Sequence, residues 1–443
     1  MKKAALAAAF LVVTLVAPAG ARSTPPPALP AATGGSTQGV TPSGMMYSVT
    51  PDPAQPAAAV ALWYRAPASG FGAVPSAGLS RVAALTVAAS APITGTPLAR
   101  LAQELGARLT IEAYPDSVSI TVLVSPEHVA RIVRAMTADY FAPVTDAAGL
   151  ALAQHDAAED GLYRSYDATD AVEDAVENVL FSSGPFHDGT IAAPKAVAAL
   201  TLDDVRTYAE RAFRPANAVL VLTGKVTPSA VTEAATRDGA TLSAEPLVHQ
   251  SVAVPDAPAR RSASIAATGL GWAGPAIDDE VAATSLDFIA DMLFSPQSGS
   301  VQRSLGSLDA KVSGTFVTYH DPGLFVVTIS GADAQAALPL VRRAIAQAAV
   351  PLSPAAFAAA RAGFAYRLLS DMETPEQLAD TFGWYAVEGN LPYAPAGDRY
   401  FHVAAGLTPQ VVARMAARFL GAAPAIVTLV PARTPTPAPV KQS

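Results

Sequence analysis

Residues 200–222 read LTLDDVRTYAERAFRPANAVLVL, and residues 407–429 read LTPQVVARMAARFLGAAPAIVTL. Each stretch opens with a threonine at a helix N-cap position, continues as an amphipathic helix, and ends in an apolar strand. The second stretch begins 207 residues after the first, and the two align without a gap. Agreement in cap, helix length, loop length and strand is the mark of a duplicated domain. We therefore predict two homologous halves in which strands 218–222 and 425–429 occupy equivalent places.

The repeat continues upstream of these two stretches. Residues 105–109 correspond to 308–312, and a proline stands two residues before a helix N-cap at both Pro143 and Pro351. The spacing between corresponding residues drifts between 203 and 208, as small loop insertions require. Capping residues, prolines and strand ends in the same order favour duplication over chance similarity within an alanine-rich chain.

Each half alternates strands that fold back as hairpins with helices that must cover a sheet face. The fold class is therefore α+β, with one such unit used twice, each a mainly antiparallel sheet covered by helices. The predicted strands are residues 58–64, 108–112, 117–124, 262–268, 314–319 and 324–330, and the predicted helices are residues 98–105, 277–293 and one long helical stretch at 145–181.

The N-terminus has the pattern of a secretory signal peptide. Lys2 and Lys3 precede an apolar run at 4–16, which is too short to span a bilayer, and an Ala-x-Ala site ends at Ala21. No later stretch is long and apolar enough to span, so we expect no membrane span after signal removal and a periplasmic or secreted location. The predicted divisions are a signal peptide at 1–21, a disordered Pro-rich spacer at 22–43, a first domain at 44–240, a linker at 241–261, a second domain at 262–431 and a disordered tail at 432–443.

Composition narrows the class of partner. The chain has 443 residues, of which 51% are hydrophobic and 15% charged, and its net charge is −8. This length and apolar content suffice for two domains with buried cores. An acidic chain does not offer the clustered Lys and Arg that nucleic acid or an anionic membrane requires, so we expect no nucleic-acid partner. The absence of cysteine excludes disulfides and thiolate metal sites.

The order of short motifs resembles the repeat unit of the pitrilysin and insulinase zinc peptidases, including the mitochondrial processing peptidases. The resemblance covers residues 44–431 and implies two tandem metallohydrolase-like domains. The motifs that carry it are Gly78-Leu79, Leu105-Gly106-Ala107, Pro185-Phe186 with Gly189-Thr190, residues 199–205, residues 214–224, and Asp321-Pro322-Gly323-Leu324-Phe325.

Active members of this family carry His-x-x-Glu-His on a helix shortly after the Gly-Leu pair. The two histidines hold Zn²⁺, and the Glu is the general base for the metal-bound water. This sequence has Arg81 at the first His position, Ala84 at the Glu position and Leu85 at the second His position. No histidine occurs before residue 128, so no shift of the alignment restores the motif. We predict no catalytic, cofactor-binding or metal-binding residues and no cofactor.

The family's third zinc ligand, a downstream Glu, corresponds by this resemblance to Glu159 or Asp160. Without histidines to complete a site, we interpret either as a solvated acid on a helix. His155 stands four residues before Glu159, a spacing that can bind a metal but is more common in surface pairs. The other five histidines are scattered singly and are interpreted as surface or loop residues.

Two further patterns bear on function. The resemblance implies a substrate-gripping Arg and Tyr in the second half, but Gly306 and Ser313 stand at those positions, with Arg303 and Tyr319 nearby as possible substitutes. Residues 269–274 satisfy G-x-G-x-x-G after a strand. A dinucleotide fold would open a helix at the third Gly, whereas Pro275 follows here, so we interpret this stretch as a strand-to-helix loop.

These observations predict a catalytically degenerate homologue, the non-catalytic subunit or scaffold of a periplasmic zinc peptidase heterodimer that handles peptides. Its expected partner is an active homologue with His-x-x-Glu-His. Two alternatives stay open: a stand-alone periplasmic module that binds peptides or proteins, and a metallopeptidase with an unrecognised site. A metal assay distinguishes the second alternative, and a monomer with bound peptide would support the first.

Overall fold

The computed structural model of the chain describes residues 35–72, 76–93, 95–231, 244–246, 248–296, 298–389 and 396–431. The predicted signal peptide at 1–21, most of the predicted spacer and the predicted tail at 432–443 lie outside the described residues. Within these ranges, no helix has the length and apolar character needed to cross a bilayer.

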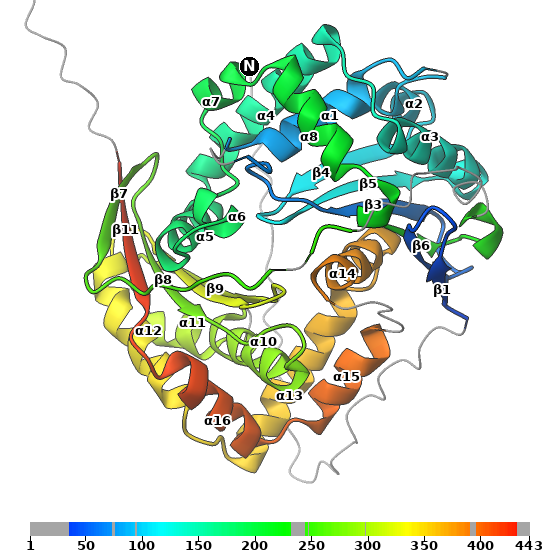
Figure 1. Cartoon of the computed structure of the whole chain (residues 1–443). Coiled ribbons are helices and arrows are strands. Elements are labelled where there is room, and N and C mark those ends of the chain that lie inside the picture. The colour runs from blue at the N-terminus through cyan, green and yellow to red at the C-terminus, as the bar shows by residue number, and fades with distance from the viewer. Residues whose placement is uncertain are drawn as a thin grey trace, which may run out of the picture.

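Two sheets form the framework of the molecule (Figure 1). The first has the strand order β1-β2-β6-β3-β5-β4, and the second has the order β7-β11-β8-β10-β9. The strands of the first sheet are β1 (Thr37–Val40), β2 (Met46–Pro51), β3 (Ala58–Arg65), β4 (Arg108–Ala113), β5 (Ser117–Val124) and β6 (Ala218–Gly224). Those of the second are β7 (Ala259–Ala263), β8 (Ala267–Ala273), β9 (Lys311–Val317), β10 (Leu324–Ser330) and β11 (Ala425–Pro431).

The two sheets share one topology once β1 is set aside. β2 runs parallel to β6, as β7 runs parallel to β11, and the remaining neighbours in both sheets are antiparallel. β6 and β11 each lie between a parallel neighbour and the central strand, β3 or β8. The predicted duplication and the predicted α+β class are therefore confirmed.

Helices of each half cover the outer face of that half's sheet (Figure 1). In the first domain these include α1 and α3, and in the second α10, α12 and α16. The helices of the first half are α1 (Leu79–Ala89), α2 (Leu98–Glu104), α3 (Val129–Phe141), α4 (Ala147–Tyr166), α5 (Ala168–Leu180), α6 (Pro185–Asp188), α7 (Pro194–Ala199) and α8 (Leu202–Ala212). Those of the second half are α10 (Glu280–Phe294), α11 (Ser300–Leu305), α12 (Ala334–Ala348), α13 (Pro354–Ser370), α14 (Pro375–Glu388), α15 (Ala396–Gly406) and α16 (Pro409–Leu420).

One helix from each half lies on the inner face of the other half's sheet. α5 packs against β8, β10 and β11, whereas α14 packs against β3, β5 and β6. The sequence prediction of one helix over 145–181 is wrong at this point. Asp167 is extended, with φ −80° and ψ 128°, and its carboxylate accepts hydrogen bonds from the N–H groups of Thr169 and Asp170. This N-cap ends α4 and redirects the chain towards the second sheet.

This exchange of α5 and α14 between the two halves explains why the central strand β3 is apolar at nearly every position. Val60, Leu62 and Tyr64 belong to the core of the first domain. The alternate residues of the same strand, Ala61 and Trp63 among them, pack against α14 instead. Successive side chains of a strand point to opposite faces, so a strand covered on both faces must be a continuous apolar run.

Glycines allow the exchanged helices to approach the sheets closely. A Cβ atom at Gly271 would lie 2.2 Å from Val176 on α5, and one at Gly383 would lie 2.0 Å from the indole nitrogen of Trp63. Gly269 and Gly271 lie within β8, which is hydrogen-bonded to β10 and β11. The G-x-G-x-x-G match is therefore a packing feature of a strand, and the rejection of a dinucleotide loop holds, although most of the stretch is strand rather than loop.

Several boundaries differ from the sequence prediction. β1 lies inside the segment assigned to the spacer, and β7 starts inside the segment assigned to the linker. The predicted strand at 262–268 is split between the end of β7 and the start of β8, which pair with opposite sides of β11. Part of the linker is also tied to the domains, because the N–H of Ala253 donates to the carbonyl of Leu180.

Candidate functional site

The helix α1 carries the positions of the missing zinc motif. Gly78, at φ 79°, precedes this helix, and a Cβ there would lie 2.7 Å from Ala192. Arg81, in the first turn, reaches across to α4, where its Nη2 lies 3.3 Å from Oδ1 of Asp160. Its Nη1 donates to the carbonyl oxygen of Ile111 on β4 at 2.6 Å and lies 3.4 Å from Oε2 of Glu112.

A guanidinium thus lies where the resemblance implies a metal cation. Asp160 is one of the two residues that the resemblance puts at the third-ligand position, and it neutralises Arg81 instead. Glu112 is half exposed, and burial raises the pKa of its carboxyl although Arg81 opposes that rise. The sequence reveals that Arg81 cannot bind a metal, but only the structure shows the pair that it forms.

The side chains at the other two motif positions have no atom that could coordinate a metal ion. Ala84 is fully buried, and its carbonyl oxygen accepts a hydrogen bond from the hydroxyl of Tyr140 at 2.9 Å. Leu85 packs against the first-domain core. Zn²⁺ requires imidazole, thiolate or carboxylate ligands, and this set supplies one carboxylate already paired with an arginine. The residues present do not fit a zinc ion. Across the described ranges, no group of three His, Asp or Glu residues could hold a metal.

The candidate pair His155 and Glu159 lies on the solvent side of α4. Their side chains are 68% and 72% exposed, and Nε2 of His155 is 3.5 Å from Oε1 of Glu159. This geometry is that of a surface pair. The two substitute residues for substrate grip are engaged within the fold: Arg303 donates to the carbonyl of Ser298, and Tyr319 is 2% exposed.

Neither an arginine nor a tyrosine stands at the positions that the resemblance gives to the family's gripping residues. Gly306 ends α11 at φ 58°, a conformation that favours glycine. Ser313 lies exposed on β9, and its hydroxyl is 3.4 Å from that of Thr169.

The second domain repeats the ionic site of the first with the charges reversed. Arg367 on α13 stands 207 residues after Asp160, and Asp287 on α10 stands 206 residues after Arg81. Nη2 of Arg367 lies 2.8 Å from Oδ2 of Asp287. The same guanidinium also contacts Asp291 at 3.3 Å and Asp371 at 2.7 Å. The sequence predictions missed this site, although charged residues placed at offsets of 206 and 207 residues are the signal that reveals it.

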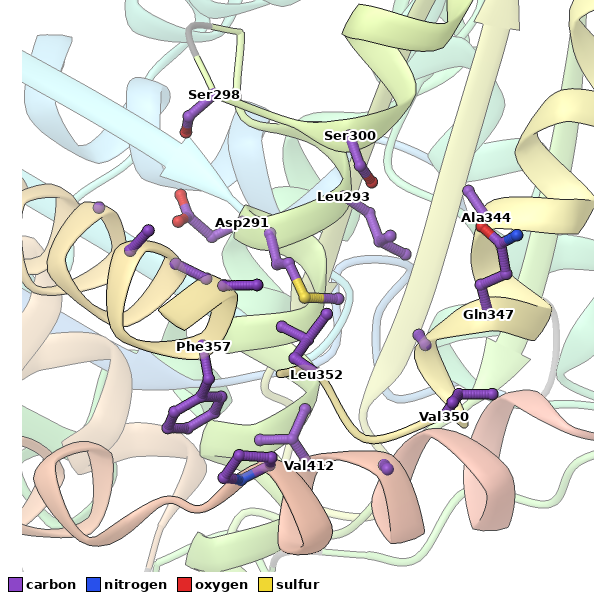
Figure 2. A pocket seen from close by; sticks show the side chains of 18 of the residues that line it. Asp291, Leu293, Ser298, Ser300, Ala344, Gln347, Val350, Leu352, Phe357 and Val412 are labelled. Atoms are coloured by element: carbon purple, nitrogen blue, oxygen red, sulfur yellow. The ribbon is translucent and has the colours of Figure 1, made fainter. Parts of the chain in front are cut away.

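A groove of about 630 Å³ adjoins this second ionic site. It is bounded by α10, α13 and the edge strand β9, and Asp287, Asp291, Arg367 and Asp371 lie along it. An adjoining cavity of about 400 Å³ shares Asp291, Ser298 and Gly363 with this groove and lies between α10, α12, α13 and α16. Figure 2 shows its apolar lining around Phe357, Leu352 and Val412, with the carboxylate of Asp291 directed away from Phe357.

Buried carboxyl groups occur where the exchanged helices meet the opposite domain. Glu177 on α5 is 2% exposed and accepts a hydrogen bond from the hydroxyl of Tyr319 at 2.6 Å. Glu388 at the end of α14 is 1% exposed and accepts one from the N–H of His320 at 2.9 Å. Burial is the main cause that raises the pKa of both carboxyls, followed by Glu173 for Glu177 and by Asp116 for Glu388.

Buried carboxyls with raised pKa values predict that the protein is less stable at higher pH. Burial, followed by Asp170, raises the pKa of Glu173 to about 7, and burial, followed by Glu376, raises that of Asp380 to about 6. A carboxyl with a raised pKa stabilises the fold fully below its unfolded pKa, and that contribution is lost as pH rises through the folded value. We therefore expect the melting temperature at pH 8 to be a few degrees below that at pH 5.

Thermal unfolding followed by circular dichroism at several pH values tests this expectation. Glu388→Gln keeps the size and the acceptor oxygen of the side chain but removes its titration, so this variant should show a flatter pH profile. A melting temperature that rises from pH 5 to pH 8 would contradict the assignment.

The first-domain site thus lacks the side-chain ligands that a zinc ion needs. Comparison with known proteins shows what the chain resembles. Residues 199–364 match the family model described as "Peptidase M16 inactive domain". No curated protein matches the sequence significantly. The matched residues 199–364 are similar to an M16 peptidase domain, which confirms for that part of the chain the resemblance inferred from the sequence.

Solved structures share the fold over nearly their whole length. A protease from Helicobacter pylori has 14% identity and a TM-score of 0.77, covering 90% of this chain and 99% of that one. The peptidase M16 inactive domain from Pseudomonas fluorescens has 18% identity and a TM-score of 0.74, covering 91% and 99%. A chain of Complex III2 from Candida albicans has 12% identity and a TM-score of 0.75, covering 89% and 96%.

Proposed function

We propose that this protein is the non-catalytic subunit of a periplasmic zinc peptidase, and that it encloses peptides together with an active His-x-x-Glu-His homologue. The observation that carries the proposal is the ion pair of Arg81 with Asp160 at the position of the missing metal. The side chains that would coordinate zinc are absent, whereas the complete two-domain fold remains. A fold kept without the zinc ligands can still serve in assembly or in enclosing a substrate.

The similarity to a chain of Complex III2 gives indirect support, because the structure that contains that chain is described as a complex. The match to an inactive-domain model points the same way. Stable pairing requires a total buried interface above about 1,000 Å², which a two-domain surface of this size can supply.

Affinity capture from the native organism tests the pairing. The tagged chain should recover a His-x-x-Glu-His protein at a ratio near one to one, and the mixture should hydrolyse peptides at least tenfold faster than the partner alone. The chain alone should be inert, with or without added Zn²⁺, because no general base stands at Ala84.

Two outcomes would replace the proposal. Hydrolysis by the pure chain that persists in Glu159→Gln would mean an unrecognised active site. An inert chain that recovers no homologue at any salt concentration, and is monomeric with bound peptide, would instead favour the stand-alone binding module.

A further inference from the structure

We propose that the cavity between α10, α12, α13 and α16 binds a single-chain amphiphile with a carboxylate head, of the medium-chain fatty-acid type. Its apolar chain would lie against Phe357 and Val412, and its carboxylate would meet Arg303. The proposal goes beyond the function proposed above and does not depend on it, because the cavity lies among helices of the second domain, away from the missing zinc motif.

Apolar side chains line most of this cavity. Leu293, Phe357 and Val412 are 3%, 6% and 4% exposed and form its inner wall. The volume of about 400 Å³ lies within the range of about 300–1,000 Å³ that is typical of small-molecule sites. An apolar cavity of about 150 Å³ holds benzene, so this larger space has room for a chain of about a dozen carbons.

The first domain fills the corresponding space with larger side chains. Helix α12 corresponds to α3 at an offset of 208 residues, at which every buried position of α12 falls on a buried position of α3. Ala344 and Ala348 line the cavity, and their counterparts at this offset are Met136 and Tyr140, which are fully buried in the first-domain core. Protein interiors are otherwise close packed. The cavity is therefore the space that these two large side chains occupy in the other copy of the repeat.

An arginine without an acidic partner lies at one end of the cavity. Figure 2 shows Ser298 and Ser300 at the end away from Phe357, and Arg303 follows Ser300 by one turn of α11. The guanidinium of Arg303 donates to the carbonyl of Ser298, and no carboxylate in the described part of the chain pairs with it. A guanidinium has five N–H donors in a planar fork that matches a carboxylate. The polar end of the cavity is therefore suited to a carboxylate head.

The acidic residue in the lining, Asp291, already has a cationic partner. Its Oδ1 lies 3.3 Å from Nε of Arg367, and its side chain is 7% exposed. Burial raises the pKa of this carboxyl, although Arg367 opposes the rise. A paired carboxyl that tends towards its neutral form repels an incoming anion weakly. Arg303 is thus the uncompensated charge of the cavity, and an anionic head is complementary to it.

The cavity is accessible from solvent beside the turn between α12 and α13. Val350 in this turn lines the cavity and is 63% exposed. Ala356 and Ala359, in the first two turns of α13, also line it and are exposed. A ligand can therefore enter without any separation of the two domains.

Isothermal titration calorimetry of the pure full-length chain with dodecanoate tests the proposal. The comparison ligands are dodecanol, which lacks the charge, and dodecyltrimethylammonium, which reverses it, each below its micelle concentration. We expect about one dodecanoate per chain, bound at least tenfold more tightly than either comparison ligand, because only dodecanoate forms a charge-assisted pair with Arg303. Butyrate should also bind at least tenfold more weakly than dodecanoate, because its chain leaves most of the apolar wall uncovered.

Two kinds of variant test the place of the ligand and the role of the charge. The double variant Ala344→Met/Ala348→Tyr restores the side chains of the first domain, so it should fill the cavity and abolish dodecanoate binding without lowering the melting temperature. Arg303→Gln should weaken dodecanoate about tenfold and leave dodecanol unchanged. The matched control is Arg342→Gln, at an exposed position of α12 that does not line the cavity, and it should change neither affinity.

Equal binding of the three dodecyl ligands, tighter binding of the ammonium ligand, or no binding of dodecanoate would each overturn the proposal. Dodecanoate binding that persists in a folded A344M/A348Y variant would do the same, because the ligand would then lie elsewhere. If that variant does not fold, the comparison of R303Q with R342Q decides, and equal dodecanoate affinities in the two would refute the role of Arg303. None of these results depends on a partner, so they leave the capture experiment on heterodimer formation to be judged separately.

Discussion

The double variant Arg81→His/Leu85→His should bind about one Zn²⁺ per chain, whereas the unmodified protein should bind none. The reason is geometric. Positions 81 and 85 are one helical turn apart on α1, so two imidazoles there lie on one face. Asp160 already faces position 81, with its Oδ1 3.3 Å from the guanidinium. Two histidines and one carboxylate form a ligand set typical of zinc peptidases.

Metal analysis of the purified chain after dialysis measures this gain. Arg81→His alone supplies only one imidazole beside Asp160 and should bind weakly, and adding Asp160→Asn to the double variant should abolish binding. A folded double variant without zinc would show that Asp160 is not placed as a ligand. No variant of this series should hydrolyse peptides, because position 84 still lacks a carboxylate to act as the base.

Replacing Gly383 by alanine should destabilise the protein by about 1–3 kcal/mol, although alanine is the better helix former. A Cβ at Gly383 would lie 2.0 Å from the indole nitrogen of Trp63 and 2.2 Å from the neighbouring ring carbon. α14 would have to move off the first sheet to make room. The larger substitution Gly383→Leu should cost more than the alanine change.

The matched control is Gly363→Ala on α13. A Cβ at that position would meet only the hydroxyl of Ser298, at 3.9 Å. The same chemical change should therefore stabilise the protein by roughly 0.5–1 kcal/mol through helix propensity. Urea unfolding of both variants measures whether each substitution lowers or raises the free energy of unfolding. Equal effects at the two sites would mean that α14 does not sit tightly on Trp63.

The duplication, the strand pairs and the missing motif could all be predicted from the sequence, because each depends on local pattern and spacing. The break at Asp167 could not, since residues on both sides of it have helical patterns and the decisive fact is which sheet each helix covers. The partner of Arg81 was hidden for a similar reason. Helical periodicity places Asp160 on a face of α4, but only packing of α4 against α1 brings that face to Arg81.

The second-domain groove depends on long-range packing in the same way. Asp287, Asp291 and Arg367 are individually ordinary charged residues on helices. They can be recognised as one site only when the two folded halves are compared position by position. The predicted bounds of the spacer and the linker differ from the structure where the chain forms the edge strands β1 and β7. These strands are short, and local sequence pattern does not mark where they pair.

The exchange of α5 and α14 has a consequence for how this gene can change. Each half carries a layer that the other half needs to close its inner sheet face, so neither half could be deleted without leaving a broad apolar face bare to water. Metal ligands, by contrast, can disappear one at a time without disturbing that mutual dependence. A protein with this architecture can lose its metal ligands, and with them catalysis, but it must keep both halves. It can then serve as the partner of another subunit.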